Sequence, residues 1–399
     1  MGTTDKPKKP RAVVPSGLWP GSSPELIAAH ERALGLVSDE DFSAVDATRG
    51  LANSLFFVVV LCLACVGISF IFEDCPGVRL DEGSVERRKY EYFAANKDEF
   101  DTLVVGSSQV YRHVNPILFD EEVAENGHST RSFNFGIGGM YMPEIFYAVD
   151  WILAQKPEKL KYMLVELREL EPVLFEQNKL SRREISWHTP EVTKFMETLA
   201  WRSDREVEEK FDLQLYTLRR ALYRLGNVSL AIPAIEDWLD GRSKNPKPWL
   251  RRGHLPIDAE LKQDPDDRIL RRRRQWFLDN PRAHAKNMEA FYEDPPNQEP
   301  EQLMIDSLTE FVAKIRAAGV EPIFFIGVPS YRNYSDIVRL EEMGVLPVLF
   351  HYHDPETYPE FYDREKLFEM RHLLSPGAER FTKLLAADFA EYLTKTGEQ

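Results

Sequence analysis

Residues 101–109 read Asp-Thr-Leu-Val-Val-Gly-Ser-Ser-Gln, and this stretch decides the fold that we expect. Residues 102–105 form a short, continuous apolar run, which is typical of a strand buried on both faces. The run stops at Gly106, and Ser107 and Ser108 follow in the turn. In open α/β sheets ligands bind beyond the carboxyl ends of such strands, so these two hydroxyl groups are site candidates, although the motif taken alone is better explained as a serine cap of the next helix.

Four further apolar runs of similar length come later in the chain, each followed by turn residues. They cover residues 132–135, 162–165, 322–326 and 346–350. Helical patterns lie between them, at residues 143–153, at 304–318 and in a last helix with Ser375 as the expected N-cap and Pro376 as its first residue. Strands that alternate with helices predict an α/β fold with a three-layer, doubly wound parallel sheet.

Residues 171–300 break this alternation between the third and fourth runs. The stretch is polar, aromatic and largely helical in pattern, and residues 271–274 are four consecutive arginines. We interpret it as a helical insertion in a domain that spans residues 73–399. The arginines fit a solvated helix face and, as an alternative, a surface for an anionic polymer or lipid head groups.

Composition argues against several classes of protein. A formal net charge of −15 over 399 residues argues against nucleic acid as a partner, because such binding usually needs a basic face. The three cysteines, Cys62, Cys65 and Cys75, provide neither a disulfide framework nor a cysteine-type zinc site. His351 and His353 share one face of the fifth run, but no other ligand cluster is nearby in sequence, so we expect no metal site.

Residues 51–72 form an uncharged run, LANSLFFVVVLCLACVGISFIF. The run is about long enough to cross the ~30 Å hydrocarbon core of a bilayer. Because residues 1–50 precede it, a cleaved signal peptide fits less well. We expect one transmembrane helix here, with a buried soluble helix as the alternative, and a flexible segment with a short helix over residues 1–50.

A second site candidate follows the run at 132–135, where residues 134–139 read Asn-Phe-Gly-Ile-Gly-Gly. Glycines let the backbone approach a ligand closely, so the Gly139 N–H is a candidate donor to an oxyanion. Asn134 is a further candidate for substrate binding. The alternative interpretation of these residues is a plain tight turn without a binding role.

A third candidate lies near the C-terminus, where Glu369 precedes His372 by three residues. A carboxylate at this spacing can orient an imidazole, which then acts as a general base on a serine. A lone surface histidine is the common alternative.

Together the three motifs, in this order after their strands, resemble the SGNH (GDSL-like) hydrolase superfamily. The resemblance is closest to its membrane-anchored, cell-envelope branch, which includes alginate O-acetylation proteins and the D-alanyl transfer protein of teichoic acid modification. Residues 106–108 read Gly-Ser-Ser in place of Gly-Asp-Ser, and residues 369–378 match Asp-x-x-His-Leu-x-x-x-Gly-Ala with Glu first. The resemblance covers most of residues 98–175 and 303–395, and none of the insertion.

The resemblance implies a role for each residue. Ser108 would be the nucleophile, and His372 its base, oriented by Glu369. The backbone N–H groups of Ser108 and Gly139 would face the oxyanion. The family's Gly-x-Asn-Asp after the third strand is missing, and Arg168 falls roughly where the oxyanion Asn would be. Losing one oxyanion donor can cost about 10² to 10³ in rate, so an altered hydrolase or an acyltransferase is implied rather than a plain esterase.

The resemblance also implies the setting. It implies a membrane-anchored acyltransferase or esterase, with acetyl as the expected group, that acts on an envelope or extracellular polysaccharide without a cofactor. Expected partners are the acylated polysaccharide or acyl donor and a multi-pass membrane O-acyltransferase. The expected location is a bacterial inner membrane, crossed once, with the C-terminal domain extracytoplasmic. Alternatives are a catalytically impaired SGNH-like binding or assembly module and an esterase for soluble substrates.

Overall fold

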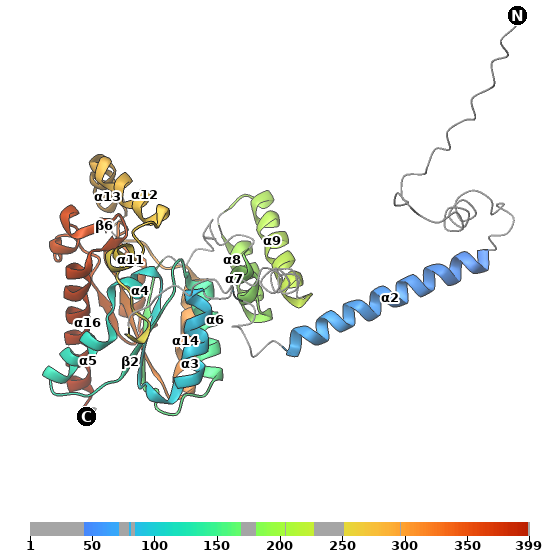
Figure 1. Cartoon of the computed structure of the whole chain (residues 1–399), viewed down its shortest axis with the longest axis horizontal. Helices are drawn as coiled ribbons and strands as arrows, with labels where there is room; N and C mark the ends of the chain where they lie inside the picture. The colour runs from blue at the N-terminus through green and yellow to red at the C-terminus, as the bar shows by residue number, and fades with distance from the viewer. Residues whose placement is uncertain are drawn as a thin grey trace, which may run out of the picture. The chain divides into compact units, whose positions relative to one another are not determined.

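The computed structural model describes residues 44–71, 80, 84–168, 181–203, 205–226, 251–295 and 297–397. The chain divides after Ala64 into two units, and the second contains the α/β domain (Figure 1). Most of the segment expected to be flexible, including its short helix, lies outside the described residues. Its last part, residues 44–50, is already helical.

Five strands form one parallel sheet in the order β2-β1-β3-β4-β5. They are β1 (Thr102–Gly106), β2 (Ser132–Gly136), β3 (Tyr162–Glu166), β4 (Glu321–Ile326) and β5 (Leu349–His351). This strand order is the flavodoxin-like one. β2 is added on one side of β1 and β3 on the other, so the order of strands in the sheet switches direction at β1 while all the strands remain parallel. The prediction of an α/β fold with a parallel sheet is therefore confirmed.

The fifth strand is the one that differs most from its predicted position. We expected it over residues 346–350, but β5 begins at Leu349. Pro347 has no N–H to donate to a ladder, so the chain can pair regularly with β4 only after it. The pairing then joins Phe324 to Leu349 and Ile326 to His351.

Apolar side chains of alternating strand positions form a core on each face of the sheet. Leu103 and Val105 lie in one core and Val104 in the other. The first core is covered by α3 (Val85–Asn96), α6 (Met142–Ala154), α14 (Gln302–Ala317) and α15 (Ser335–Glu342). The second is covered by α4 (Ser108–His113), α5 (Pro116–Glu125) and α16 (Ser375–Thr396), on the other side of the sheet in Figure 1.

The chain between β3 and β4 contributes two groups of helices. The first group, α7 (Arg182–Trp187), α8 (Pro190–Arg202) and α9 (Val207–Leu225), packs beside α6. The second group is η4 (Arg251–Gly253), α11 (Ile257–Gln263), α12 (Arg268–Asp279) and α13 (Pro281–Glu293). Its α12 contacts β6 (Leu367–Glu369), which pairs antiparallel with β7 (His372–Leu373). Three short 3-10 turns complete the described elements: η2 (Lys97–Glu99), η5 (Pro359–Phe361) and η6 (Arg364–Lys366).

The start of α16 differs by one residue from the predicted capping. Leu374 is the N-cap and has no capping side chain, while Ser375 is the first helical residue. Asp258 of α11 takes over the cap, because its Oδ1 accepts from the Ser375 N–H at 3.1 Å and from the Ser375 hydroxyl at 2.6 Å. The insertion thus stabilises the helix end that the local sequence leaves open.

The helix α2 (Ala44–Ile71) covers nearly all of the uncharged run expected to cross a membrane. Its side chains at residues 49–64 are exposed. The side chains at 65–66 and 68–71, and all of Phe72, lie outside the described part of the chain. Within the described part, no helix combines the length and the apolar character needed to cross a membrane.

Candidate functional site

The two serines after β1 occupy different positions. Ser107 is the N-cap of α4, and its Oγ accepts from the Gln109 N–H at 3.1 Å. Ser108 is the first residue of the helix and is half-buried, whereas Ser107 is buried. A Cβ atom at Gly106 would lie 2.6 Å from the Glu166 Cβ, so only glycine lets β1 end this close to β3.

The structure brings Ser108, His372 and Glu369 into one chain of hydrogen bonds. The Ser108 Oγ lies 2.8 Å from the His372 Nε2. On the other side of the ring, the His372 Nδ1 contacts the Glu369 Oε1 directly. A neutral imidazole that donates from Nδ1 to the carboxylate can accept the serine proton at Nε2, and this is the arrangement that a serine nucleophile needs.

The short hairpin of β6 and β7 holds both the carboxylate and the imidazole. The buried His113 accepts from the Leu373 N–H through its Nε2, at 3.0 Å. Gln109 donates from Nε2 to the Arg371 carbonyl at 3.0 Å. Because His113 and Gln109 both belong to α4, the helix that begins at Ser108 also positions the hairpin that carries its base.

The electrostatics of the site favour a charged Glu369 beside a neutral His372. Burial raises the pKa of Glu369, but His372 and the Arg273 guanidinium lower it more, and it comes to about 2. The Arg273 Nη2 lies 3.0 Å from the Glu369 Oε1. Burial lowers the pKa of His372 below its ordinary value; Glu369 opposes this, and Arg273 adds to it. At neutral pH the imidazole is therefore free to act as a base.

The glycine turn after β2 lies beside the end of β1, since the Ile137 N–H donates to the Gly106 carbonyl at 2.8 Å. Gly139 has a positive φ of 69°, which favours glycine. The Arg183 Nη1 donates to the Gly138 carbonyl at 2.6 Å, and Arg183 also binds Glu144 with two bonds of 2.6 and 2.8 Å. The C=O and N–H of one trans peptide point in opposite directions, so Arg183 also fixes the direction of the Gly139 N–H.

Asn134 occupies a structural position, in contrast to the substrate-binding role that the sequence indicates. Its Nδ2 donates to the carbonyls of Val110 and Val114, at 2.6 and 2.7 Å. Its Oδ1 accepts from the Gly136 N–H at 2.8 Å and from the Lys89 Nζ at 3.2 Å. Both amide hydrogens are used and the side chain is fully buried, so none is left for an oxyanion.

Arg168 reaches the neighbour of the nucleophile. Its Nη1 donates to the Ser107 Oγ at 3.4 Å. The Ser107 N–H donates in turn to the Oε2 of the buried Glu166, at 2.6 Å. Where the resemblance would place an oxyanion Asn, this chain therefore has groups that hold the helix cap at Ser107.

Sequence reasoning missed the contribution of the arginine run on α12. The Arg274 Nη1 donates to the carbonyls of Leu367 and Phe368, at 2.6 and 2.7 Å, and so holds β6. Arg273 pairs with Glu369, as described above, whereas Arg272 is exposed. A solvated helix face therefore describes only part of the run. The contact with β6 spans the gap between the insertion and the C-terminal motif, which no local pattern reveals.

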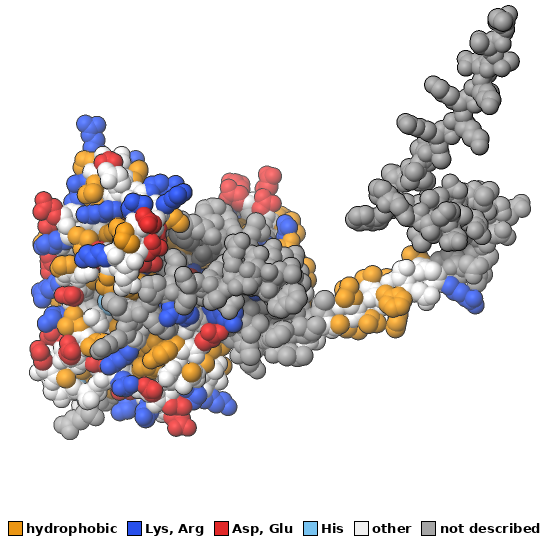
Figure 2. Space-filling view, viewed as in Figure 1, with side chains coloured by type: hydrophobic (Ala, Val, Ile, Leu, Met, Phe, Trp, Pro, Cys, Tyr) orange, Lys and Arg blue, Asp and Glu red, His pale blue; other side chains and the backbone are white. Residues whose placement is uncertain are grey.

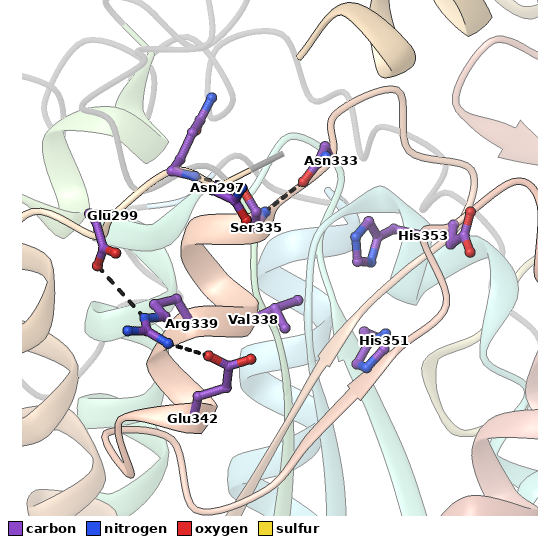
Figure 3. A pocket seen from close by; sticks show the side chains of 11 residues that line it. Asn297, Glu299, Asn333, Ser335, Val338, Arg339, Glu342, His351 and His353 are labelled. Carbon is purple, nitrogen blue, oxygen red and sulfur yellow. Dashed lines mark hydrogen bonds and ion pairs between the residues drawn. The ribbon is translucent and has the colours of Figure 1, made fainter. Parts of the chain in front are cut away.

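Away from these residues, a cavity of about 540 Å³ lies at the end of β5 (Figure 3). Most of the residues that line it are of polar types, among them His351, Asn333 and Arg339, and Arg339 is paired with Glu342 at 2.6 Å. None of Ser108, His372 and Glu369 lines it. In the part of the chain that the structure describes, no group of three His, Cys, Asp or Glu side chains is placed to hold a metal ion.

Comparison with models of known protein families, with curated proteins and with solved structures gave no match. The geometry of the site therefore carries the functional argument.

Proposed function

We propose that this protein is an SGNH-like acyltransferase or esterase that moves an acyl group, with acetyl as the expected group, on or from an envelope polysaccharide. The observation that supports the proposal most is the 2.8 Å contact between the Ser108 Oγ and the His372 Nε2, with Glu369 behind the ring. Residues far apart in the sequence meet here in the order that nucleophilic catalysis needs.

In the first half of the reaction, the Ser108 Oγ attacks the carbonyl carbon of the acyl donor and its proton passes to the His372 Nε2. Glu369 stabilises the imidazolium that forms. The tetrahedral intermediate collapses, the bond to the leaving alkoxide breaks, and the alkoxide takes the proton from His372. The acyl group is then held on Ser108 as an ester.

In the second half, a hydroxyl group attacks the acyl-serine. His372 removes its proton, the ester bond to Ser108 breaks, and the serine oxygen recovers the proton. A sugar hydroxyl as acceptor gives acyl transfer, and water gives hydrolysis. The same groups serve both outcomes, so access of the acceptor decides between them.

Negative charge on the intermediate needs donors near Ser108. As the first residue of α4, Ser108 has an N–H without an intrahelical acceptor. The Gly139 N–H is the second candidate, held in direction by Arg183. In this proposal, these two backbone groups would take the place of a side-chain donor of the Asn type.

The surface around the site suits a large polar substrate. Ile269, Arg272, Arg273 and Trp276 follow one another at helical spacing on one face of α12, and Arg273 contacts Glu369. Trp276 is 51% exposed, and an exposed indole can stack on the apolar face of a sugar ring. In Figure 2, Lys and Arg side chains gather over the region of α12 and α13, which adds a surface for anionic groups.

The proposal includes a membrane setting. The uncharged run at residues 51–72 is the expected anchor, and the α/β domain would lie on the extracytoplasmic side of a bacterial inner membrane. A multi-pass O-acyltransferase that hands the acyl group across the membrane is the expected partner. A protease-protection assay on intact and permeabilised spheroplasts tests the setting. A domain degraded only after permeabilisation would contradict an extracytoplasmic location.

The test of the activity is ester turnover by the full-length protein, with 4-nitrophenyl acetate as donor and a soluble oligosaccharide as acceptor. We expect Ser108→Ala to lower the rate at least about 10³-fold, because the proposed reaction holds the acyl group on the Ser108 oxygen. Ser335→Ala, in the cavity at the end of β5, serves as the matched control and is expected to keep the rate. Equal turnover by wild type and Ser108→Ala would rule out the proposed nucleophile.

A second candidate function is a binding or assembly module without catalysis. The observation in its favour is that Arg168 and Glu166 hold the cap at Ser107, where the family would have an oxyanion motif. In that case ester turnover of wild type would equal that of His372→Ala, while binding of polysaccharide would persist in both.

A further inference from the structure

The helix α9 has its polar side buried and its apolar side exposed. Toward its own domain it presents Thr217, Arg220 and Arg224, all buried. Arg220 pairs with Glu184 at 3.0 Å, and the Arg224 Nε donates to the Ser186 carbonyl at 3.0 Å. In most surface helices the apolar face packs against the core of the domain. The apolar face of α9 instead points outward, at the outer edge of the insertion in Figure 1.

The outward face is a continuous row of large apolar side chains that are between 40% and 64% exposed. Its members are Val207, Phe211, Leu215, Leu218, Leu222 and Leu225. From Phe211 on they follow one another at steps of four, three, four and three residues, which is the spacing of a seam between two packed helices. Trp201 of α8 extends the row, because its ring packs edge to face against that of Phe211, with the two ring centroids 6.3 Å apart.

The charged side chains beside this row are arranged so that a second copy of the same helix would complement them. Glu208 and Asp212 lie in the N-terminal half of α9, and Arg219 lies seven residues after Asp212 on the same flank of the row. No described residue forms an ion pair with Asp212 or Arg219; the Arg219 Nε donates to the Tyr223 hydroxyl. An identical helix that runs antiparallel would bring Asp212 to Arg219, and Arg219 to Asp212.

We propose that the row from Val207 to Leu225 is the interface with a second copy of this chain, in which two α9 helices pack antiparallel about a twofold axis. Leu215 then meets Leu218 of the second copy, and Phe211 meets Leu222 of the second copy. Each contact occurs twice, as twofold symmetry requires. The two helix dipoles oppose each other, which adds to the attraction of the flanking charges.

A bilayer surface fits this row less well than a second helix does. Helices that lie on membranes have a broad apolar face and a polar face rich in Lys and Arg. Here the row is narrow, and the N-terminal turn carries Glu208 and Glu209. One helix pair is small beside a standard interface of about 800 Å² per partner, so we expect a dissociation constant in the roughly micromolar range.

Sedimentation equilibrium of the full-length protein in detergent tests the proposal by charge reversal. We expect Asp212→Arg and Arg219→Asp each to weaken the dimer at least about tenfold, because each places like charges opposite one another. The double variant restores the pairs and is expected to return to within about threefold of wild type. The matched control is Glu379→Arg on the exposed side of α16, which is expected to leave the constant unchanged.

Each of the following results would overturn the proposal: a monomeric wild type at about 100 μM, single variants that associate like wild type, or a double variant no tighter than the weaker single one. A dimer that forms through the α2 segment alone gives the second of these results. Leu218→Glu keeps the buried side of α9 intact and is expected to abolish the dimer, which separates loss of the interface from loss of the fold.

Discussion

The two sides of the candidate site differ in how completely the described residues assemble them. On the proton-transfer side, Ser108, His372 and Glu369 are already at hydrogen-bonding distance, and α12 and α4 hold them there. The other side consists of the side chains expected to bind the oxyanion, and we call it the oxyanion side. There, Asn134 donates to a buried carbonyl and Arg168 donates to the Ser107 hydroxyl. The difference teaches that the groups for proton transfer are already assembled, whereas under the proposed function charge stabilisation would fall to backbone N–H groups.

The largest expected effect comes from removing the base. His372→Ala should lower turnover of 4-nitrophenyl acetate at least about 10³-fold, because Ser108 loses the group that accepts its proton. The double variant Ser108→Ala/His372→Ala should be no slower than the slower single variant, since the two act as a unit. Additive losses in the double variant would show that the two residues work independently, which would contradict a direct proton transfer between them.

A smaller loss is expected at the carboxylate. Glu369→Gln keeps the shape but no longer holds a charge behind the ring, so the imidazolium is less stable and the tautomer less well fixed. We expect kcat to fall about 10²- to 10⁴-fold with little change in KM. A fall confined to KM, measured with the same ester, would assign Glu369 to binding instead.

Arg273 sharpens the comparison through pH dependence. Because His372 acts as a neutral base, kcat/KM falls as pH drops through its pKa, which lies below the ordinary value of about 6.5. Arg273→Gln removes a positive charge near the ring and leaves Glu369 without its second partner, so the pKa of His372 rises and the acidic limb moves to higher pH. The pH–rate profile measures this, and a limb that stays in place or moves down would contradict the assigned role.

The smallest effect is expected on the oxyanion side. Arg168→Gln should slow turnover less than about tenfold, because its Nη1 donates to the Ser107 Oγ, next to the nucleophile. The measurement is kcat/KM for the same ester, with Arg202→Gln on the exposed end of α8 as control. A loss of about 10² to 10³ would instead mean that Arg168 contacts the oxyanion, and the two sides of the site would then be equally developed.

Local patterns were sufficient to predict most of the strands and their parallel arrangement. Short apolar runs ending at Gly106, Gly136 and similar turn residues identify parallel strands, because such strands are buried on both faces. The exception at β5 arose from Pro347, whose missing N–H delays the ladder. Capping by Asp258 was not predictable, since the partner of Ser375 lies in another helix.

The site could be predicted in part, for a similar reason. Ser108 and the pair Glu369 and His372 lie next to strand ends or in one short motif, so sequence neighbours indicate them. The roles of Arg273 and Asn134 depend on long-range packing. Arg273 comes from the insertion, and the contacts of Asn134 with Val110 and Val114 show only once β2 lies under α4. No residue pattern within either segment predicts those contacts.

Labelling of the full-length protein with a fluorophosphonate, followed by peptide mapping, tests the central claim most directly. The reagent needs a serine activated by a base, and Ser107 next to Ser108 provides an internal comparison. We predict a label on Ser108 alone, retained in Ser107→Ala, lost in Ser108→Ala and strongly slowed in His372→Ala. A label on Ser107, or on neither serine while the protein is folded, would contradict the account.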